Sequence, residues 1–303
     1  MMKRLDLNMT DISENIKIAI ASGKGGTGKT FVATNLFNAL LHAKMPATIV
    51  DCDAEEPNVH LFFEGTPVKN SDVFQNVPVI DESLCTHCGR CHEYCSYNAI
   101  FHVPSLKVIN VMEELCHGCG ACFVACRDNA IHAKQKSLGS VTQIMINDQS
   151  CFIEARTRIG VYSSVKVIKA AIAEAKTDSF VILDSPPGTS CPFIQTANLS
   201  DFVVLVTEPT PFGLSDLKQS VETLSQMNKM MGVVVNKSGI GNIEVYEYLK
   251  EKNIPLLMEI PFSRDIAKAY STGVLITSND KNQRNNFLEL FEKIRQQLWK
   301  SQS

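Results

Sequence analysis

The chain has 303 residues, of which 45% are hydrophobic and 20% are charged, and its formal net charge is −3. This length and composition suit one large α/β domain, alone or with a small insert, and the lack of basic character gives no reason to expect nucleic acid as a partner. Residues 1–15 are polar and lack the apolar core of a secretory signal, and no apolar run is long enough to predict a transmembrane span. We therefore expect a cytoplasmic protein, in which eleven cysteines favour metal binding over disulfides.

A phosphate-binding loop is predicted at residues 23–30. The pattern G-x-x-x-x-G-K-[ST] is matched by the run Gly23-Lys24-Gly25-Gly26-Thr27-Gly28-Lys29-Thr30. An alternating apolar stretch over 16–21 precedes the loop and helically spaced apolar residues over 33–41 follow it, so the loop joins a strand to a helix. Its N–H groups and the helix N-terminus would bind phosphate, Lys29 would reach the β- and γ-phosphates, and Thr30 would ligate Mg²⁺. The alternative is an ordinary glycine-rich turn.

The next predicted strand, over residues 47–51, ends in an acid. Asp51 closes the strand and Asp53 follows it. Because functional groups gather at the carboxyl ends of strands in an open parallel sheet, we expect both acids near the γ-phosphate. The alternative for each is a solvated loop acid. From about Gly65, prolines and scattered polar residues predict that the chain leaves the sheet.

Two copies of the cysteine run C-x2-C-x2-C-x3-C follow, and their first members, Cys85 and Cys116, are 31 residues apart. This is the pattern of bacterial two-cluster ferredoxins, in which the fourth cysteine of each run ligates the other cluster. It predicts one [4Fe–4S] cluster on Cys85, Cys88, Cys91 and Cys126, and a second on Cys116, Cys119, Cys122 and Cys95. Zinc is the alternative metal. Ser96 and Arg127 replace the proline that usually follows the fourth cysteine.

The chain then returns to alternating strands and helices. We expect strands near 143–147, 180–184, 202–206, 232–235 and 256–260, and helices over 165–175 and 214–227. The fold class is therefore α/β, a doubly wound and mostly parallel sheet with a small inserted bacterial-ferredoxin-like domain. The expected boundaries are residues 1–66 and 141–303 for the domain with the phosphate-binding loop and 67–140 for the insert, whose cluster core spans 80–134.

Several residues from Asp184 onward are also candidates for a functional role. Asp184 ends the strand 180–184 at the Walker B position, where it would hold Mg²⁺ through water, and Gly188 could offer its N–H to the γ-phosphate. Cys191 is expected to be a buried small hydrophobe, with pairing across a dimer or sensing of the cluster state as the alternatives. The apolar stripe of the C-terminal helix predicts packing on the sheet, with membrane binding as the alternative.

The loop resembles the deviant Walker A loop of the MinD/ParA/Mrp ATPases because Lys24 gives it a second lysine. The resemblance implies that Lys24 reaches the partner's nucleotide in an ATP-dependent homodimer; a solvated lysine is the alternative. It also implies that Asp53 orients the attacking water with Asp51 as support, and that Asn236 contacts the adenine. A plain asparagine cap is the alternative for Asn236.

Taken together, the chain resembles MinD-superfamily ATPases that carry an inserted ferredoxin domain. The resemblance implies a Mg²⁺-dependent, dimeric ATPase that couples ATP turnover to electron transfer through two [4Fe–4S] clusters, with an unknown redox or metallocluster protein as its partner. One alternative is a metallocofactor assembly or carrier ATPase, although no cysteine beyond Cys191 supplies the C-x-x-C of Mrp-type carriers. Another is a positioning ATPase with a redox sensor. We expect neither nucleic-acid binding nor stable membrane association.

Overall fold

The computed structural model describes residues 16–175 and 179–300. The N-terminal segment 1–15, on which the expectation about a secretory signal depends, lies outside the described residues. The strands are β1 (Lys17–Ala21), β2 (Ala47–Asp51), β3 (Thr66–Ile80), β4 (Ile100–Val103), β5 (Val108–Val111), β6 (Ile131–Met145), β7 (Cys151–Thr157), β8 (Phe180–Asp184), β9 (Phe202–Thr207), β10 (Met231–Ser238) and β11 (Leu256–Pro261). The helices are α1 (Lys29–His42), α2 (Arg90–Glu93), α3 (Ala121–Ala125), α4 (Val165–Ala173), α5 (Cys191–Asn198), α6 (Pro211–Gln226), α7 (Glu244–Glu251), α8 (Arg264–Ser271), α9 (Ile276–Asn279) and α10 (Lys281–Lys300).

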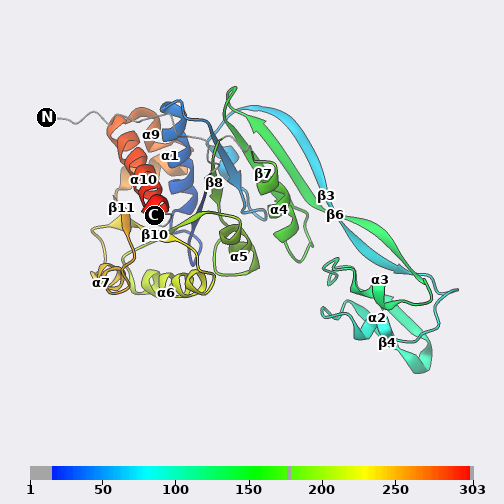
Figure 1. Cartoon of the computed structure of the whole chain (residues 1–303). Coiled ribbons are helices and arrows are strands. Elements are labelled where there is room, and N and C mark those ends of the chain that lie inside the picture. Colours follow the sequence, from blue (N-terminus) through cyan, green and yellow to red (C-terminus); the bar gives the residue numbers. More distant parts are fainter. Residues whose placement is uncertain (1–15, 176–178, 301–303) are drawn as a thin grey trace.

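One large sheet has the strand order β11-β10-β9-β1-β8-β2-β7-β6-β3. The strands from β11 to β7 are parallel, and β6 and β3 are added antiparallel at one edge. Successive side chains of a strand point to opposite faces, so Ile18 and Ile20 of β1 enter one core with α1 and α10. Ala19 and Ala21 enter the other core, which α4, α5, α6 and α7 cover. The predicted doubly wound, mostly parallel sheet is therefore confirmed (Figure 1).

The C-terminal helix packs on this sheet as expected. Its apolar stripe is buried in the core on the α1 side, and consists of Phe287, Leu290, Phe291, Ile294 and Leu298. Across residues 16–175 and 179–300, none of the helices has both the length and the apolar character that a bilayer crossing requires.

The expectation that the chain leaves the sheet at Gly65 is wrong. The strand β3 begins at Thr66 and pairs with β6 from Thr66–Met145 to Ile80–Ile131, so these strands form a long ribbon that starts in the main sheet. Prolines 67 and 78 are tolerated because β3 is the edge strand of that sheet, where one side of the backbone needs no partner. The strand β7 was not predicted either.

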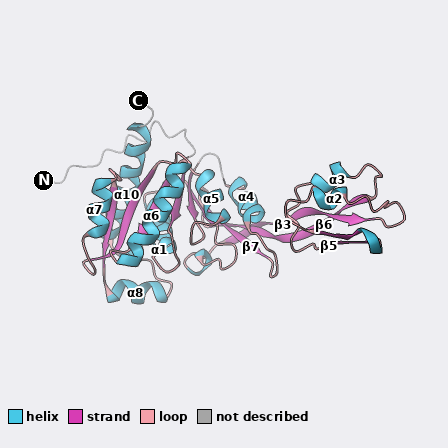
Figure 2. Ribbon diagram, turned by 90° about the horizontal axis from the view of Figure 1, so that it is seen from below, coloured by secondary structure: helices cyan, strands magenta, loops and turns pink. Residues whose placement is uncertain are grey.

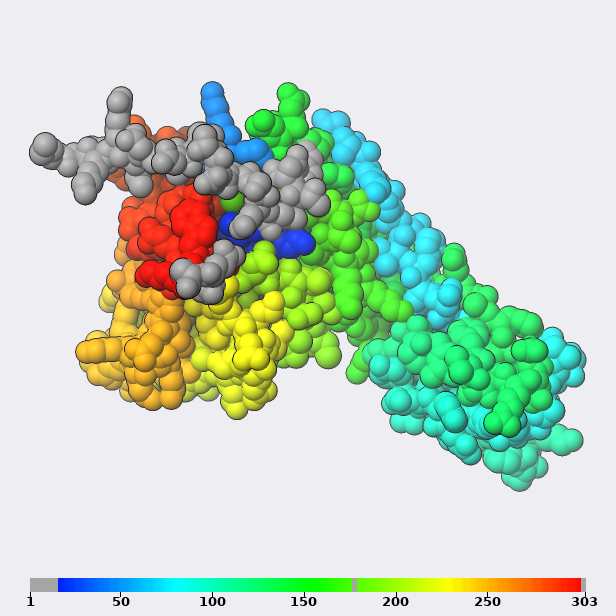
Figure 3. Space-filling model, viewed as in Figure 1, coloured from blue at the N-terminus to red at the C-terminus, as the bar shows by residue number. Residues whose placement is uncertain are grey.

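The ribbon of β3 and β6 carries a small unit away from the body of the molecule (Figures 2 and 3). We call residues 81–130 the distal unit; it contains α2, α3 and the hairpin of β4 and β5. Its two halves repeat the same backbone contacts 31 residues apart. The N–H of Asp81 donates to Ala130 O at 2.8 Å, and the N–H of Met112 donates to Ala99 O at the same distance. The sequence repeat is therefore also a structural repeat.

Candidate functional site

A cavity of about 460 Å³ opens where the carboxyl ends of the parallel strands meet the phosphate-binding loop. Its walls come from distant parts of the chain, as expected for a parallel sheet. They include residues 25–26 and 28–31 of the loop and α1, together with Asp53, Glu56, Asn58, Pro187, Asn236, Lys237, Pro261, Phe262, Ser263, Ile266, Ala267 and Tyr270. The predicted loop and Asp53 thus lie at one cavity.

The loop has a conformation that requires glycine at two positions. Gly28 has a φ of 101°, and a Cβ there would lie 2.4 Å from Asn236 Nδ2. At Gly23 a Cβ would lie 2.5 Å from the carbonyl oxygen of Asp216. Because side chains are excluded, the backbone can approach a ligand closely. This geometry matches the phosphate cradle that the sequence predicts.

A buried acid, Asp184, lies behind Thr30 of the cavity wall. Thr30 Oγ1 donates to Asp184 Oδ2 at 2.6 Å, whereas the buried Oδ1 of Asp184 has no hydrogen-bond partner among the described residues. Burial raises the pKa of Asp184 well above its usual range, and the neighbouring Asp51 raises it further. Burial also lowers the pKa of Lys29, against the opposing effects of Asp184 and Asp53. A Mg²⁺ ion would fit this donor set, because it prefers carboxylate and hydroxyl oxygens and would supply the missing partner.

Asp51 organises the loop that carries Asp53. Its Oδ2 accepts the N–H groups of Asn58 at 2.7 Å and Val59 at 2.9 Å, and its Oδ1 accepts the N–H of Asp53 at 3.2 Å. The carboxylate therefore holds residues 53–59 in place, so that Asp53 lines the cavity. Burial raises the pKa of Asp51 to about 7 despite these hydrogen bonds.

The raised pKa makes stability depend on pH in the nucleotide-free and Mg²⁺-free protein. The folded state holds the Asp51 proton more tightly than the unfolded chain, so this stabilisation is present below the ordinary value of 3.8 and lost as the pH rises through about 7. From about pH 5 to about pH 8, we expect wild type to lose about 2–3 kcal/mol of unfolding free energy relative to Asp51→Asn. Urea titrations measure this, with the exposed Asp148→Asn as control. Parallel pH profiles for wild type and Asp51→Asn would contradict the assignment.

Two residues predicted to contact nucleotide are hydrogen-bonded within the protein, and Lys24, predicted to reach the partner's nucleotide, lies outside the cavity of its own chain. The side chain of Asn236 lines the cavity, but its Nδ2 donates to Thr27 O at 2.8 Å and its Oδ1 accepts the N–H of Lys237 at 2.9 Å. The N–H of Gly188 donates to Ser22 O at 3.1 Å, so a phosphate contact would require this segment to move. Lys24 is not among the described residues that line the cavity. Their roles toward nucleotide remain predictions.

Tyr270 of α8 was missed because no motif marks it. Its ring stacks on Phe62 with centroids 5.1 Å apart and meets Phe31 edge-on at 5.7 Å, which brings it to the cavity. Burial raises the pKa of Tyr270 to about 12, with a smaller effect from Asp184. The hydroxyl therefore stays protonated close to Thr30. The only signal in the sequence was the apolar face of the helix 264–271.

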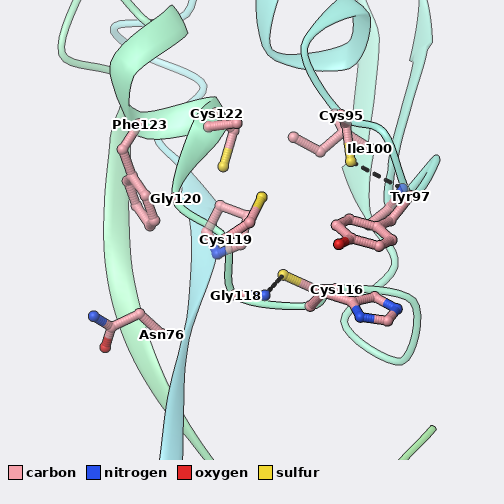
Figure 4. A pocket seen from close by; sticks show the side chains of 14 residues that line it. Asn76, Cys95, Tyr97, Ile100, Cys116, Gly118, Cys119, Gly120, Cys122 and Phe123 are labelled. Atoms are coloured by element: carbon pink, nitrogen blue, oxygen red, sulfur yellow. Dashed lines mark hydrogen bonds between the residues drawn. The ribbon is translucent and has the colours of Figure 1, made fainter. Parts of the chain in front are cut away.

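In the distal unit, four cysteines line a second, small cavity of about 20 Å³ (Figure 4). They are Cys95, Cys116, Cys119 and Cys122, the set predicted to share the second cluster. The N–H of Ala99 donates to Cys95 Sγ at 3.3 Å, and the N–H of Gly118 donates to Cys116 Sγ at 3.4 Å. Such N–H···S contacts stabilise thiolates and tune the potential of a bound cluster.

The other predicted set gathers around Arg90. Cys91 is buried, which raises the pKa of its thiol, and the nearby Cys85 and Cys88 raise it further. The Arg90 backbone N–H, and then its guanidinium, lower the pKa of Cys88. The pKa of Arg90 is itself raised mainly by the bond to Cys88, with a smaller effect from Cys126. Of this set, Cys85 packs against the buried apolar cluster that includes Cys91.

The repeat extends to the sulfur contacts. The N–H of Ala130 donates to Cys126 Sγ at 3.3 Å, as that of Ala99 does to Cys95. Within the described ranges, no three His, Cys, Asp or Glu side chains converge closely enough to hold a single metal ion.

Among the other cysteines, Cys52 and Cys151 are buried, whereas Cys191 is exposed, so its predicted burial is wrong. Cys191 begins α5 on the surface and points to no core.

Comparison with known proteins shows the family of this chain. The model of the CobQ/CobB/MinD/ParA nucleotide binding domain matches residues 18–276, which is most of the chain. The chain belongs to the CobQ/CobB/MinD/ParA family. The phosphate-binding loop, Asp53 and Asp184 therefore lie in a nucleotide-binding domain, and the loop and Asp53 line the cavity described above.

Relatives extend over nearly the whole chain. An uncharacterised protein of Methanocaldococcus jannaschii is 32% identical over 286 residues, which cover 93% of this chain and 97% of the relative. An iron-sulfur cluster carrier protein of Pyrococcus abyssi is 25% identical over 299 residues, covering 92% and 85%. The cell division ATPase MinD of Pyrococcus furiosus has the same fold, with a TM-score of 0.56 and 21% identity over 93% of this chain and 99% of MinD.

Proposed function

We propose that this MinD/ParA-type protein is a Mg²⁺-dependent, dimeric ATPase that carries two [4Fe–4S] clusters and couples ATP turnover to electron transfer with a redox or metallocluster protein. In this proposal Lys29 and the loop N–H groups bind the phosphates, Thr30 and Asp184 hold Mg²⁺, and Asp53 orients the attacking water. Lys24 of each chain contacts the nucleotide that its partner in the dimer binds. When bound, each cluster would accept and release one electron.

One observation carries the iron–sulfur part of the proposal. Cys95 reaches across the repeat to the cavity lined by Cys116, Cys119 and Cys122. This exchange of the fourth cysteine is what a two-cluster ferredoxin-like domain requires. Thiolates are soft ligands that suit iron–sulfur clusters, and a four-iron cluster needs its cysteines further apart than a single zinc ion does. The absence of a tight single-ion group in the described residues is compatible with such a cluster.

Metal analysis tests this part. Anaerobically purified wild type should contain about eight iron and eight sulfide per chain, as two cubanes require. The exposed, repeat-related Cys88 and Cys119 form a matched pair of sites, because neither thiol is buried in the unit's core. We expect Cys88→Ala and Cys119→Ala each to lower the iron content to about four, with different residual electron paramagnetic resonance spectra. Cys191→Ala should retain about eight. Zinc, or no metal, at these cysteines would contradict the proposal.

A second candidate function is supported by the similarity to the iron-sulfur cluster carrier protein of P. abyssi. In a carrier, the clusters held by the eight distal cysteines would be cargo that leaves during ATP turnover. Loaded protein can be incubated with Mg·ATP and an excess of an iron-free acceptor ferredoxin, and then separated from it. Electron transfer predicts unchanged iron on the chain, whereas a carrier predicts ATP-dependent transfer of iron to the acceptor. Mg·ADP provides the control.

A further inference from the structure

The two predicted cluster sites differ in how they relate to the body of the molecule. A cavity of about 320 Å³ separates the distal unit from the ATPase core. Its distal wall includes Tyr97, Cys116 and His117, and its core wall includes Tyr162, Lys166 and Cys191. Cys116 lines both this cavity and the sulfur cavity. The site of Cys95, Cys116, Cys119 and Cys122, which we call the proximal site, therefore borders the core.

A chain of hydrogen bonds joins the core to the proximal site. Lys166 Nζ donates to Gln75 Oε1 at 3.2 Å, and Gln75 Nε2 donates to the carbonyl oxygen of Cys116 at 2.8 Å. Gln75 is buried, so both ends of its amide are committed and its orientation is defined. A Cβ at Gly118 would lie 2.7 Å from Lys166 Nζ, so the ammonium group rests against the backbone whose N–H donates to Cys116 Sγ.

Aromatic contacts follow the same route. The rings of Tyr97 and His117 stack with centroids 3.8 Å apart, and the ring of His117 meets that of Tyr162 at 5.7 Å. The repeat places Thr86 at the position equivalent to His117, and Thr86 donates to Asp128 at 2.7 Å within the distal unit itself. At the second sulfur site, around Arg90, this loop position thus bonds within the distal unit.

The helix that carries Lys166 packs against elements of the ATPase core. Lys166 lies in the first turn of α4, and α4 packs against α5, β6 and β7. The helix α5 begins at Cys191, directly after the segment 185–190 that follows Asp184. The helix that carries Lys166 therefore contacts the helix that follows the Mg²⁺-binding strand.

We propose that Lys166 is a positioning residue for the proximal site: through Gln75 it fixes the Cys116 loop against the ATPase core, and its positive charge stabilises the reduced form of a cluster held there. This rests on the proposed function, since it requires a cluster at the proximal site. A cation beside a cluster favours the state with the extra electron, because reduction adds negative charge in a poorly screened setting. Arg90 is the cation of the other site, two residues after Cys88 in the sequence.

Potentiometric titration followed by electron paramagnetic resonance tests the proposal on the loaded, full-length protein. Lys166→Met should shift the reduction equilibrium of one cluster about tenfold toward the oxidised form, which is about 59 mV for a one-electron couple, and leave the other unchanged. Lys166→Arg keeps the charge and should recover most of the shift. Arg90→Met is the matched control and should move the other cluster.

Iron content, measured on each variant first, distinguishes a failure of the role of Lys166 from a failure of the proposed function. About eight iron per chain in every variant, with potentials that Lys166→Met leaves unchanged or shifts equally for both clusters, would overturn the role of Lys166 and leave the proposed function intact. Wild type without clusters would overturn both. A shift confined to one cluster, reversed by Lys166→Arg, would support the role.

Discussion

Lys24→Ala should abolish ATP-induced dimerisation and lower the rate of ATP hydrolysis by about 100-fold or more. The loop positions Lys29 and Thr30 at the cavity, but Lys24 does not line the cavity among the described residues. A lysine in the phosphate loop that does not face its own nucleotide can neutralise charge on a partner's nucleotide when two chains close face to face. Removing that charge would remove both the link between the chains and the stabilisation of the transferring phosphoryl group.

Three measurements check this prediction. Sedimentation velocity with Mg·ATP should show a dimer for wild type and a monomer for Lys24→Ala. Nucleotide affinity should change by no more than about threefold, because binding and catalysis draw on different groups. Lys29→Ala, in contrast, should lose nucleotide binding itself, and the exposed Lys250→Ala on α7 should behave as wild type. A Lys24→Ala protein that still dimerises and hydrolyses ATP at the wild-type rate would refute the role of this lysine.

Removing iron and sulfide should unfold the distal unit while the ATPase core stays folded. The buried apolar cluster of the unit consists of Cys91, Ile100, Ile109 and Cys122, so half of its members are predicted cluster ligands. Burying an isoleucine contributes about 1.5–3 kcal/mol, whereas ordering one residue costs about 1–2 kcal/mol of backbone entropy. A core of this size cannot offset the ordering of residues 81–130 unless cluster binding contributes most of the folding free energy.

Hydrogen exchange measured by mass spectrometry can localise this effect. In the iron-free protein, peptides within 81–130 should exchange about 100-fold faster or more than in the loaded protein. Peptides from β8 and α10, which lie in the main core, serve as internal controls and should keep their protection. Full protection of residues 81–130 without iron would show that the unit is stable by itself.

Much of the candidate nucleotide site follows from local sequence. The loop 23–30 and the acids at 51, 53 and 184 were predicted because such sites combine a short motif with strand ends, and both are local properties. The predicted strand 180–184 has the bounds of β8. The role of Asp51 was less visible, because its three N–H partners are two to eight residues away and depend on how the loop folds back.

Longer-range features escaped prediction for identifiable reasons. Pro67 and Pro78 indicated a loop, yet an edge strand has one side of its backbone free of ladder bonds and accepts proline. Cys191 lacks any local pattern that distinguishes a buried thiol from an exposed one. Tyr270 enters the nucleotide cavity only because α8 folds over it, next to Phe62, which is far away in sequence.

By itself, the sequence determined the chemistry of this protein: a phosphate loop with a second lysine, acids at strand ends, and two cysteine runs 31 residues apart. Within each motif the spacings are a few residues, which the local backbone converts directly into geometry. Only the tertiary structure decided how the cysteine runs are placed relative to the domain that carries the phosphate loop. The length and twist of the ribbon formed by β3 and β6 bring Cys116 next to Gln75, Lys166 and Tyr162, and such a juxtaposition depends on strand register over many residues.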